Sequence, residues 1–185
     1  MYNLSSIYKD IFEPVESELK IYKEDRFVLC PELWNKFKFN DLPNIDFTKW
    51  KVLKLLNETG DFSEELSTIS NLVGGIYIYA IMPNVIPVCG SYIMYIGRAL
   101  KTEHENLRRR IKSYRNELRD DSKRERVHEL FRLWGNYIYV FYLPISSDNK
   151  TIGELETRLI GALLPPCNAD IQAESVKGKV RAFSR

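Results

Sequence analysis

Uncharged hydrophobic runs in the second half of the chain predict three strands. Residues 75–82 and 91–96 are rich in aromatic and β-branched side chains, which favours buried strands. The loop 83–90 contains prolines and a glycine, so we expect the two strands to pair as an antiparallel hairpin. Residues 137–143 have the same composition and predict a third strand, although their aromatic rings could also stack on nucleic-acid bases.

Apolar residues spaced three or four apart predict helices around these strands. Residues 107–118 and 127–134 each place apolar side chains on one helical face, and Gly135 ends the second helix. A further helix is expected to begin at Thr151, whose spacing to Glu154 matches a capping box, and to end before Pro165. Residues 71–185 are therefore predicted to form a small α/β (α+β) domain, with a short antiparallel three-stranded central sheet flanked by helices.

Residues 1–70 show weaker patterns and are treated as a mainly helical N-terminal extension. Apolar residues within 7–15 predict one helix, and a three-residue spacing within 47–56 predicts another that ends before Gly60. Between them, residues 30–43 are aromatic and irregular. The positions that predict the second helix are Phe47, Trp50, Leu53 and Leu56.

Composition excludes several classes of protein. A length of 185 residues with 44% hydrophobic residues fits one globular domain with an extension, not a disordered chain. Three widely spaced cysteines, Cys30, Cys89 and Cys167, match neither a disulfide framework nor a zinc ribbon. Because we find neither a long apolar run nor an apolar leader, we expect a cytoplasmic protein without a membrane partner.

Charge is distributed unevenly along the chain. Residues 1–73 contain 9 Lys/Arg and 13 Asp/Glu, residues 74–96 contain no charge, and residues 97–132 contain 12 Lys/Arg and 7 Asp/Glu. The local basic excess is typical of a protein that binds phosphate groups. A salt-bridged, solvated helical surface is the alternative interpretation.

One carboxylate lies among apolar positions of the last predicted helix. Glu156 follows Ile152 by one turn and precedes Leu159 and Ile160. An unpaired carboxylate buried there would cost several kcal/mol. The pattern therefore requires a metal ion or an arginine beside Glu156.

Several short motifs occur in an order that resembles the GIY-YIG nuclease superfamily. They are Gly75-Ile76-Tyr77, Tyr95-Ile96-Gly97 followed by Arg98, then Arg110, Glu156 and Asn168. The resemblance covers about residues 74–170. Residues 110–114 and 155–168 look similar to the incision module of bacterial excision-repair nucleases. The long loops and the extension look more like the superfamily's restriction endonucleases.

The resemblance implies a metal-dependent DNA endonuclease that hydrolyses phosphodiester bonds, of restriction or defence type. A stand-alone DNA-repair or mobile-element nuclease and a non-catalytic nucleic-acid-binding protein are the alternatives. Glu156 would be the single protein ligand of one Mg²⁺ or Mn²⁺, and Arg110 would bind the scissile phosphate. The catalytic set implied is Tyr77, Tyr95, Arg98, Arg110, Tyr114 and Glu156, with Gly97 and Asn168 supporting it and with Arg108, Arg109, Lys112 and Arg115 binding nucleic acid.

The water-activating group and the assembly stay open at this point. By resemblance the water is activated by Tyr77, while Tyr114 takes a place that some relatives fill with histidine; a free phenol is a poor base unless nearby cations lower its pKa. Double-stranded DNA is the expected partner. One active site cuts one strand, so we expect a homodimer at least on DNA. Residues 1–70 would form the interface, cover the catalytic sheet or serve as a DNA-specificity element.

Overall fold

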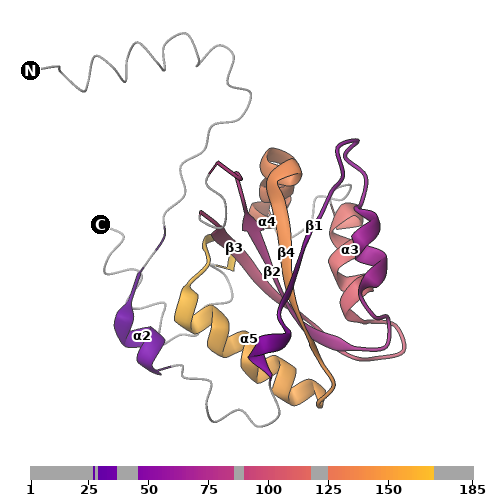
Figure 1. Ribbon diagram of the computed structural model, residues 1–185. Coiled ribbons are helices and arrows are strands. Elements are labelled where there is room, and N and C mark those ends of the chain that lie inside the picture. Colours follow the sequence, from indigo (N-terminus) through magenta and orange to yellow (C-terminus); the bar gives the residue numbers. More distant parts are fainter. Residues whose placement is uncertain (1–26, 28, 37–45, 86–89, 118–124, 169–185) are drawn as a thin grey trace, which may run out of the picture.

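The computed structural model describes residues 27, 29–36, 46–85, 90–117 and 125–168 (Figure 1). These residues form an α/β structure around a four-stranded antiparallel sheet with the strand order β1-β4-β2-β3. The strands are β1 (Lys51–Lys54), β2 (Gly74–Ile81), β3 (Tyr92–Ala99) and β4 (Ile138–Ile145). Strand β3 therefore forms one edge of the sheet and β2 lies inside it.

The predicted hairpin is confirmed, because β2 and β3 pair in antiparallel register. Tyr77 lies opposite Gly97 and Tyr79 lies opposite Tyr95, with a register shift directly after Tyr79. Strand β4 pairs with the other side of β2, so β2 has partners on both sides. Its uncharged sequence follows from this position, since a central strand between two covered faces has no solvent-exposed side.

Helices cover both faces of the sheet (Figure 1). On one face, α3 (Leu107–Glu117) and α4 (Glu125–Trp134) pack against the aromatic side of β2 and β3. On the other face, α5 (Asn149–Leu163) packs against the aliphatic side of the same strands. The short helix α2 (Pro31–Lys36) lies beside α5.

Alternation along the strands separates the hydrophobic core into two layers. Tyr77, Tyr79 and Tyr95 point toward α3 and α4, whereas Ile76 and Ile96 point toward α5. This follows from the period of two along a strand, which sends neighbouring side chains to opposite faces. The same rule assigns every predicted site residue of β2 and β3 to one face or the other.

The fourth strand shows that the predicted three-stranded sheet was one strand short, and it contradicts the helix predicted over residues 47–56. Residues Phe47–Lys49 form only a short 3-10 helix, and Lys51–Lys54 form β1, which pairs with β4. Leu53 and Leu55 are buried while Val52 is exposed, so the period along this segment is two rather than three. Pairing with the edge of β4 supplies backbone hydrogen bonds that the local spacing does not reveal.

The start of α5 also differs from the prediction. The helix begins at Asn149, and Asp148 caps it by accepting a hydrogen bond from the Thr151 backbone N–H at 2.9 Å. This hydrogen bond, with one from the Thr151 hydroxyl, lowers the pKa of Asp148. Aspartate caps a helix as well as threonine does, so the helix gains two residues ahead of Thr151. Glu154 pairs instead with Arg158 one turn later, at 2.5 Å.

Some predictions fall outside the described residues, among them the helix within 7–15, the aromatic residues Phe37 and Phe39, and Cys89. The strand over 137–143 is confirmed as β4, with Ile138, Val140 and Tyr142 buried. In the parts of the chain given above, no helix has the length and apolar character needed to cross a membrane.

Candidate active site

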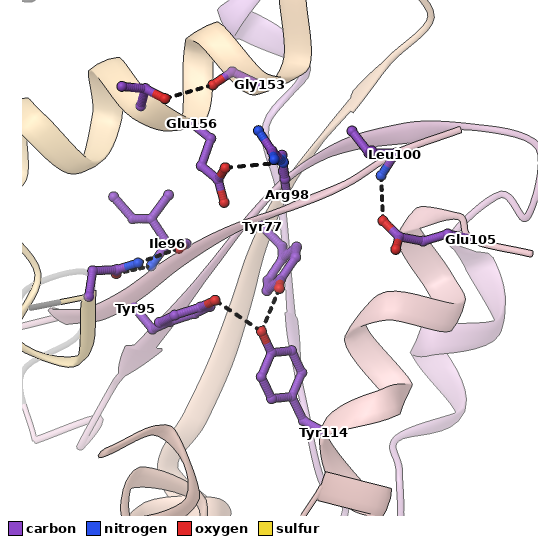
Figure 2. Close-up of polar contacts among 11 residues, drawn as sticks. Tyr77, Tyr95, Ile96, Arg98, Leu100, Glu105, Tyr114, Gly153 and Glu156 are labelled. Carbon is purple, nitrogen blue, oxygen red and sulfur yellow. Dashed lines mark hydrogen bonds and ion pairs between the residues drawn. The ribbon is translucent and has the colours of Figure 1, made fainter. Parts of the chain in front are cut away.

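Three tyrosine hydroxyls meet between the sheet and α3 (Figure 2). The Tyr77 hydroxyl lies 2.6 Å from that of Tyr114, and the Tyr114 hydroxyl donates to that of Tyr95 at 3.2 Å. All three side chains are buried, and they come from β2, β3 and α3. The structure therefore brings together three residues that are up to 37 positions apart in the sequence.

Gly97 makes room for this cluster. It lies opposite Tyr77 in the register of β2 and β3, and a Cβ atom at this position would overlap the Tyr77 hydroxyl and ring. Tyr79 packs against the cluster, since its ring centroid lies 5.3 Å from that of Tyr77. The Tyr79 hydroxyl donates to the Ile111 carbonyl at 3.3 Å. Glycine at 97 is thus required by close approach rather than by backbone conformation.

Burial controls the ionisation of the cluster. It raises the pKa of Tyr77 well above the usual value, and it raises the pKa of Tyr114 in the same direction. The Arg110 guanidinium carbon lies 5.3 Å from the centroid of the Tyr114 ring, and its charge lowers the pKa of both tyrosines by less than burial raises it. Burial therefore favours the neutral form of Tyr77 and Tyr114, whose hydroxyls hydrogen-bond to each other.

The second group of predicted residues lies on the opposite face of the sheet. Arg98 Nε of β3 is 3.3 Å from Glu156 Oε2 of α5 (Figure 2). The Arg98 side chain is 44% exposed and the Glu156 side chain 13% exposed. Arg98 is thus a partner of one of the two kinds, an arginine or a metal ion, that the sequence predicts for Glu156.

Gly153, one turn before Glu156, shapes the space in which Arg98 lies. A Cβ atom on Gly153 would be 2.7 Å from Arg98 Nη1, which is closer than real Cβ contacts. Sequence reasoning missed this residue as part of the site. A glycine within a helix was the available signal, because it costs about 1 kcal/mol relative to alanine and often marks close packing.

The free edge of β3 carries backbone contacts on both sides of Arg98. The Asn168 side chain accepts from the Ile96 N–H and donates to the Ile96 carbonyl, both at 2.7 Å. Glu105 accepts from the Leu100 N–H at 2.6 Å, a second contact for which the sequence carries no signal. Because backbone directions alternate along a strand, the N–H and C=O of Arg98 face the same edge. Within the described part of the chain, no residue bonds them.

The predicted catalytic residues therefore form two groups separated by the sheet. Tyr77, Tyr95, Tyr114 and Arg110 lie on the side of α3, and the Arg98–Glu156 pair lies on the side of α5. They meet neighbouring positions of β3, since Gly97 lies against Tyr77 and Arg98, the next residue, pairs with Glu156.

The basic residues predicted to bind nucleic acid differ in what their side chains contact. Arg108 donates from Nε to the Ile69 carbonyl at 2.5 Å and from Nη2 to the Ser67 carbonyl, so its guanidinium holds the segment before β2. Arg109 is exposed and donates to the Glu103 carbonyl at 3.2 Å. The Lys112 ammonium lies 5.9 Å from the centroid of the Phe62 ring. The side chain of Arg115 lies outside what is described.

Of the residues that the structure describes, Glu156 would be the single protein ligand of a divalent ion at this site. Among the described residues, no three His, Cys, Asp or Glu side chains gather into a metal-binding group. Glu156 offers one carboxylate, whose oxygen atoms are ligands that Mg²⁺ and Mn²⁺ prefer. Water and phosphate oxygens would supply the other ligands. The donor chemistry therefore agrees with the predicted ion, and Arg98 stands beside the same carboxylate.

No protein-family model, no curated protein and no solved structure matches this chain. The class defined by fold and site is an α/β protein that carries a buried tyrosine cluster on one face of an antiparallel sheet and an arginine–glutamate pair on the other. One fold can support many chemistries, so function is inferred from these side chains.

Proposed function

We propose that this protein is a GIY-YIG-type endonuclease that hydrolyses phosphodiester bonds in DNA with the help of one divalent metal ion. The observation that carries the proposal is that Gly97 and Arg98, adjacent residues of β3, contact the tyrosine cluster on one face of the sheet and Glu156 on the other. Hydroxyl donors, arginines and a carboxylate are the groups that phosphodiester hydrolysis requires.

Each residue would contribute in a way that its surroundings permit. Arg110 would hold the scissile phosphate, because its planar fork suits phosphate oxygens and its guanidinium already lies over the Tyr114 ring. Tyr77 and Tyr95 would orient a water or a phosphate oxygen through their hydroxyls. Burial keeps the pKa of Tyr77 high, so Tyr77 would do so as a hydrogen-bonding group. Tyr114 bonds both of these hydroxyls and would fix their directions.

Glu156 would hold the Mg²⁺ or Mn²⁺ ion. A bound divalent ion lowers the pKa of water and neutralises charge on phosphoryl oxygens, which compensates for tyrosines that are poor bases. Asn168 would act as a positioning residue, because its two hydrogen bonds to Ile96 join the end of the glutamate helix to β3. Arg98 would meet the phosphate from the edge of the sheet.

The extended loops and the N-terminal segment favour a restriction-type or other defence nuclease within this class, acting in the cytoplasm on double-stranded DNA. A stand-alone repair or mobile-element nuclease shares the same chemistry. A single site cuts one strand, so we also propose a homodimer on DNA. A non-catalytic DNA-binding protein is the rival function, and it would need the basic helix α3 but not the Glu156 carboxylate.

The test is cleavage of supercoiled plasmid by the purified full chain with Mg²⁺, with the cut ends sequenced. Glu156→Gln is expected to fold, to bind DNA at least as well because one negative charge is removed, and to lose at least about a thousandfold in rate. Glu154→Gln on the same helix is the matched control, since it removes only an exposed pair with Arg158. Equal losses in both variants, or no cleavage by the wild type, would contradict the proposal.

A further inference from the structure

We propose that Arg98 is a resident counter-ion of Glu156 that a divalent cation must displace, so that Arg98 sets the cation concentration at which the site fills. This inference rests on the proposed function and specifies the regulation of its metal site. It starts from the contact between Arg98 Nε and Glu156 Oε2 at 3.3 Å. A guanidinium at that distance repels a second cation on the same carboxylate, so the two compete for it.

Burial indicates which partner moves. Glu156 is 13% exposed and is carried by the interior of α5, whereas the Arg98 side chain is 44% exposed and stands at the edge strand. A long, half-exposed side chain has other rotamers available, while a mostly buried glutamate does not. The exchange therefore proceeds by departure of Arg98, with the carboxylate staying in place.

Gly153 is what allows Arg98 to sit beside Glu156. The missing Cβ leaves space for Arg98 Nη1, which would otherwise lie 2.7 Å from it. The atom that would be crowded is the end of a flexible side chain, so alanine at 153 moves the guanidinium rather than the backbone. Alanine also favours the helix, so this substitution weakens the ion pair without removing a charge.

Displacement gives the arginine a second use. Arg98 follows Gly97 on the free edge of β3, beside the point where the tyrosine cluster approaches. Once it leaves Glu156, its guanidinium is available to a phosphate at the same edge. Cation binding and phosphate binding would then favour each other through one side chain.

The test measures Mn²⁺ binding to the full chain by the electron paramagnetic resonance signal of free Mn²⁺, without any cleavage. Arg98→Ala is expected to bind Mn²⁺ about fivefold to tenfold more tightly than the wild type, because the competing cation is gone. Gly153→Ala is expected to bind more tightly by about twofold or more, with no change in net charge. Arg158→Ala removes an equal charge, but from α5, where Arg158 pairs with Glu154 instead of Glu156. This variant is expected to stay within about twofold of the wild type.

Different failures point to different errors. If Arg98→Ala binds Mn²⁺ no more tightly than Arg158→Ala, the counter-ion role is overturned while a metal site at Glu156 still stands. If Glu156→Gln binds Mn²⁺ as the wild type does, the ion does not use Glu156, and the proposed metal role is overturned together with this inference. Tighter binding in both Arg98→Ala and Gly153→Ala, absent in Arg158→Ala and abolished by Glu156→Gln, supports the proposal.

Discussion

Gly97 lies so close to Tyr77 that a single methyl group at position 97 would overlap the tyrosine hydroxyl. The two residues face each other across β2 and β3, and the hydroxyl goes on to bond Tyr114 at 2.6 Å. We expect Gly97→Ala to lower the free energy of unfolding by about 1–3 kcal/mol, because overpacking a buried site displaces the ring. Urea denaturation followed by circular dichroism measures this change.

The matched control is Gly135→Ala. A Cβ at position 135 would lie 3.3 Å from Leu56 Cδ1, the end of a flexible side chain, so it is expected to change stability by less than about 1 kcal/mol. Gly97→Ala should also abolish DNA cleavage, since it displaces the hydroxyl network. Wild-type stability in Gly97→Ala would show that Tyr77 has room to move.

Arg110 and Arg109 are neighbours on α3 that the structure places in different surroundings. Arg110 lies over the Tyr114 ring, whereas Arg109 is exposed and contacts only the Glu103 carbonyl in what is described of its side chain. We expect Arg110→Ala to lower the cleavage rate much more than DNA affinity. We expect Arg109→Ala mainly to weaken binding and to flatten its dependence on salt, since peripheral phosphate contacts act through counterion release.

Arg108→Ala separates a folding role from a binding role on the same helix. Its guanidinium holds the carbonyls of Ser67 and Ile69, so the variant is expected to lose about 1–3 kcal/mol of stability with an unchanged salt slope. Single-turnover kinetics and titrations at several salt concentrations distinguish the three arginines. Identical cleavage rates and salt slopes in all three variants would contradict a catalytic role that is particular to Arg110.

Much of the sheet was predictable because its signals are local. The uncharged strand sequences around Tyr77 and Tyr95 reflect burial on both faces, and Pro83 with Gly90 marks the loop that joins them. Strand β1 was not predictable from its spacing. Leu53 and Leu56 fit one face of a helix, whereas Leu53 and Leu55 fit one face of a strand, and only pairing with β4 resolves the ambiguity.

The site was predictable in its members but not in its arrangement. The isolated carboxylate of Glu156 required a cation, and the structure supplies Arg98. That Arg98 and Tyr95 lie on opposite faces follows from strand alternation, which applies only once the strand boundaries are known. The high pKa of Tyr77 could not be foreseen, since it depends on burial by α3 and α4.

The buried tyrosines make the fold sensitive to alkaline conditions. The pKa of Tyr77 in the folded protein is raised above 10.0, its ordinary value, so the neutral form is favoured by folding. This contribution is fully present below about pH 10 and is lost as the pH rises from there toward the folded-state pKa. We expect the free energy of unfolding to fall by up to about 1.4 kcal/mol per pH unit for each such tyrosine.

Phenylalanine substitutions test the source of that sensitivity. Tyr77→Phe is expected to lose about 1 kcal/mol at pH near 8 through its hydrogen bond with Tyr114, and to lose less than the wild type on going to pH near 11. Tyr92→Phe, at a half-exposed position of β3, is expected to keep the wild-type dependence. A steep alkaline loss that is unchanged in Tyr77→Phe would assign it to other groups.

The last prediction concerns dimerisation through the segment before β2. Trp34 is 45% exposed on α2 and Val52 is 52% exposed on the edge strand β1, so this segment presents apolar surface that a partner could bury. Light scattering of the full chain is expected to show a dimer when target DNA is added.

Trp34→Ser combined with Val52→Ser should reduce double-strand breaks while single-strand nicking persists, because each active site is left intact. Val85→Ser, which removes an 81% exposed valine from the loop after β2, is the control and should change neither. A wild type that stays monomeric on DNA and still makes double-strand breaks in one binding event would show instead that this segment only covers the sheet.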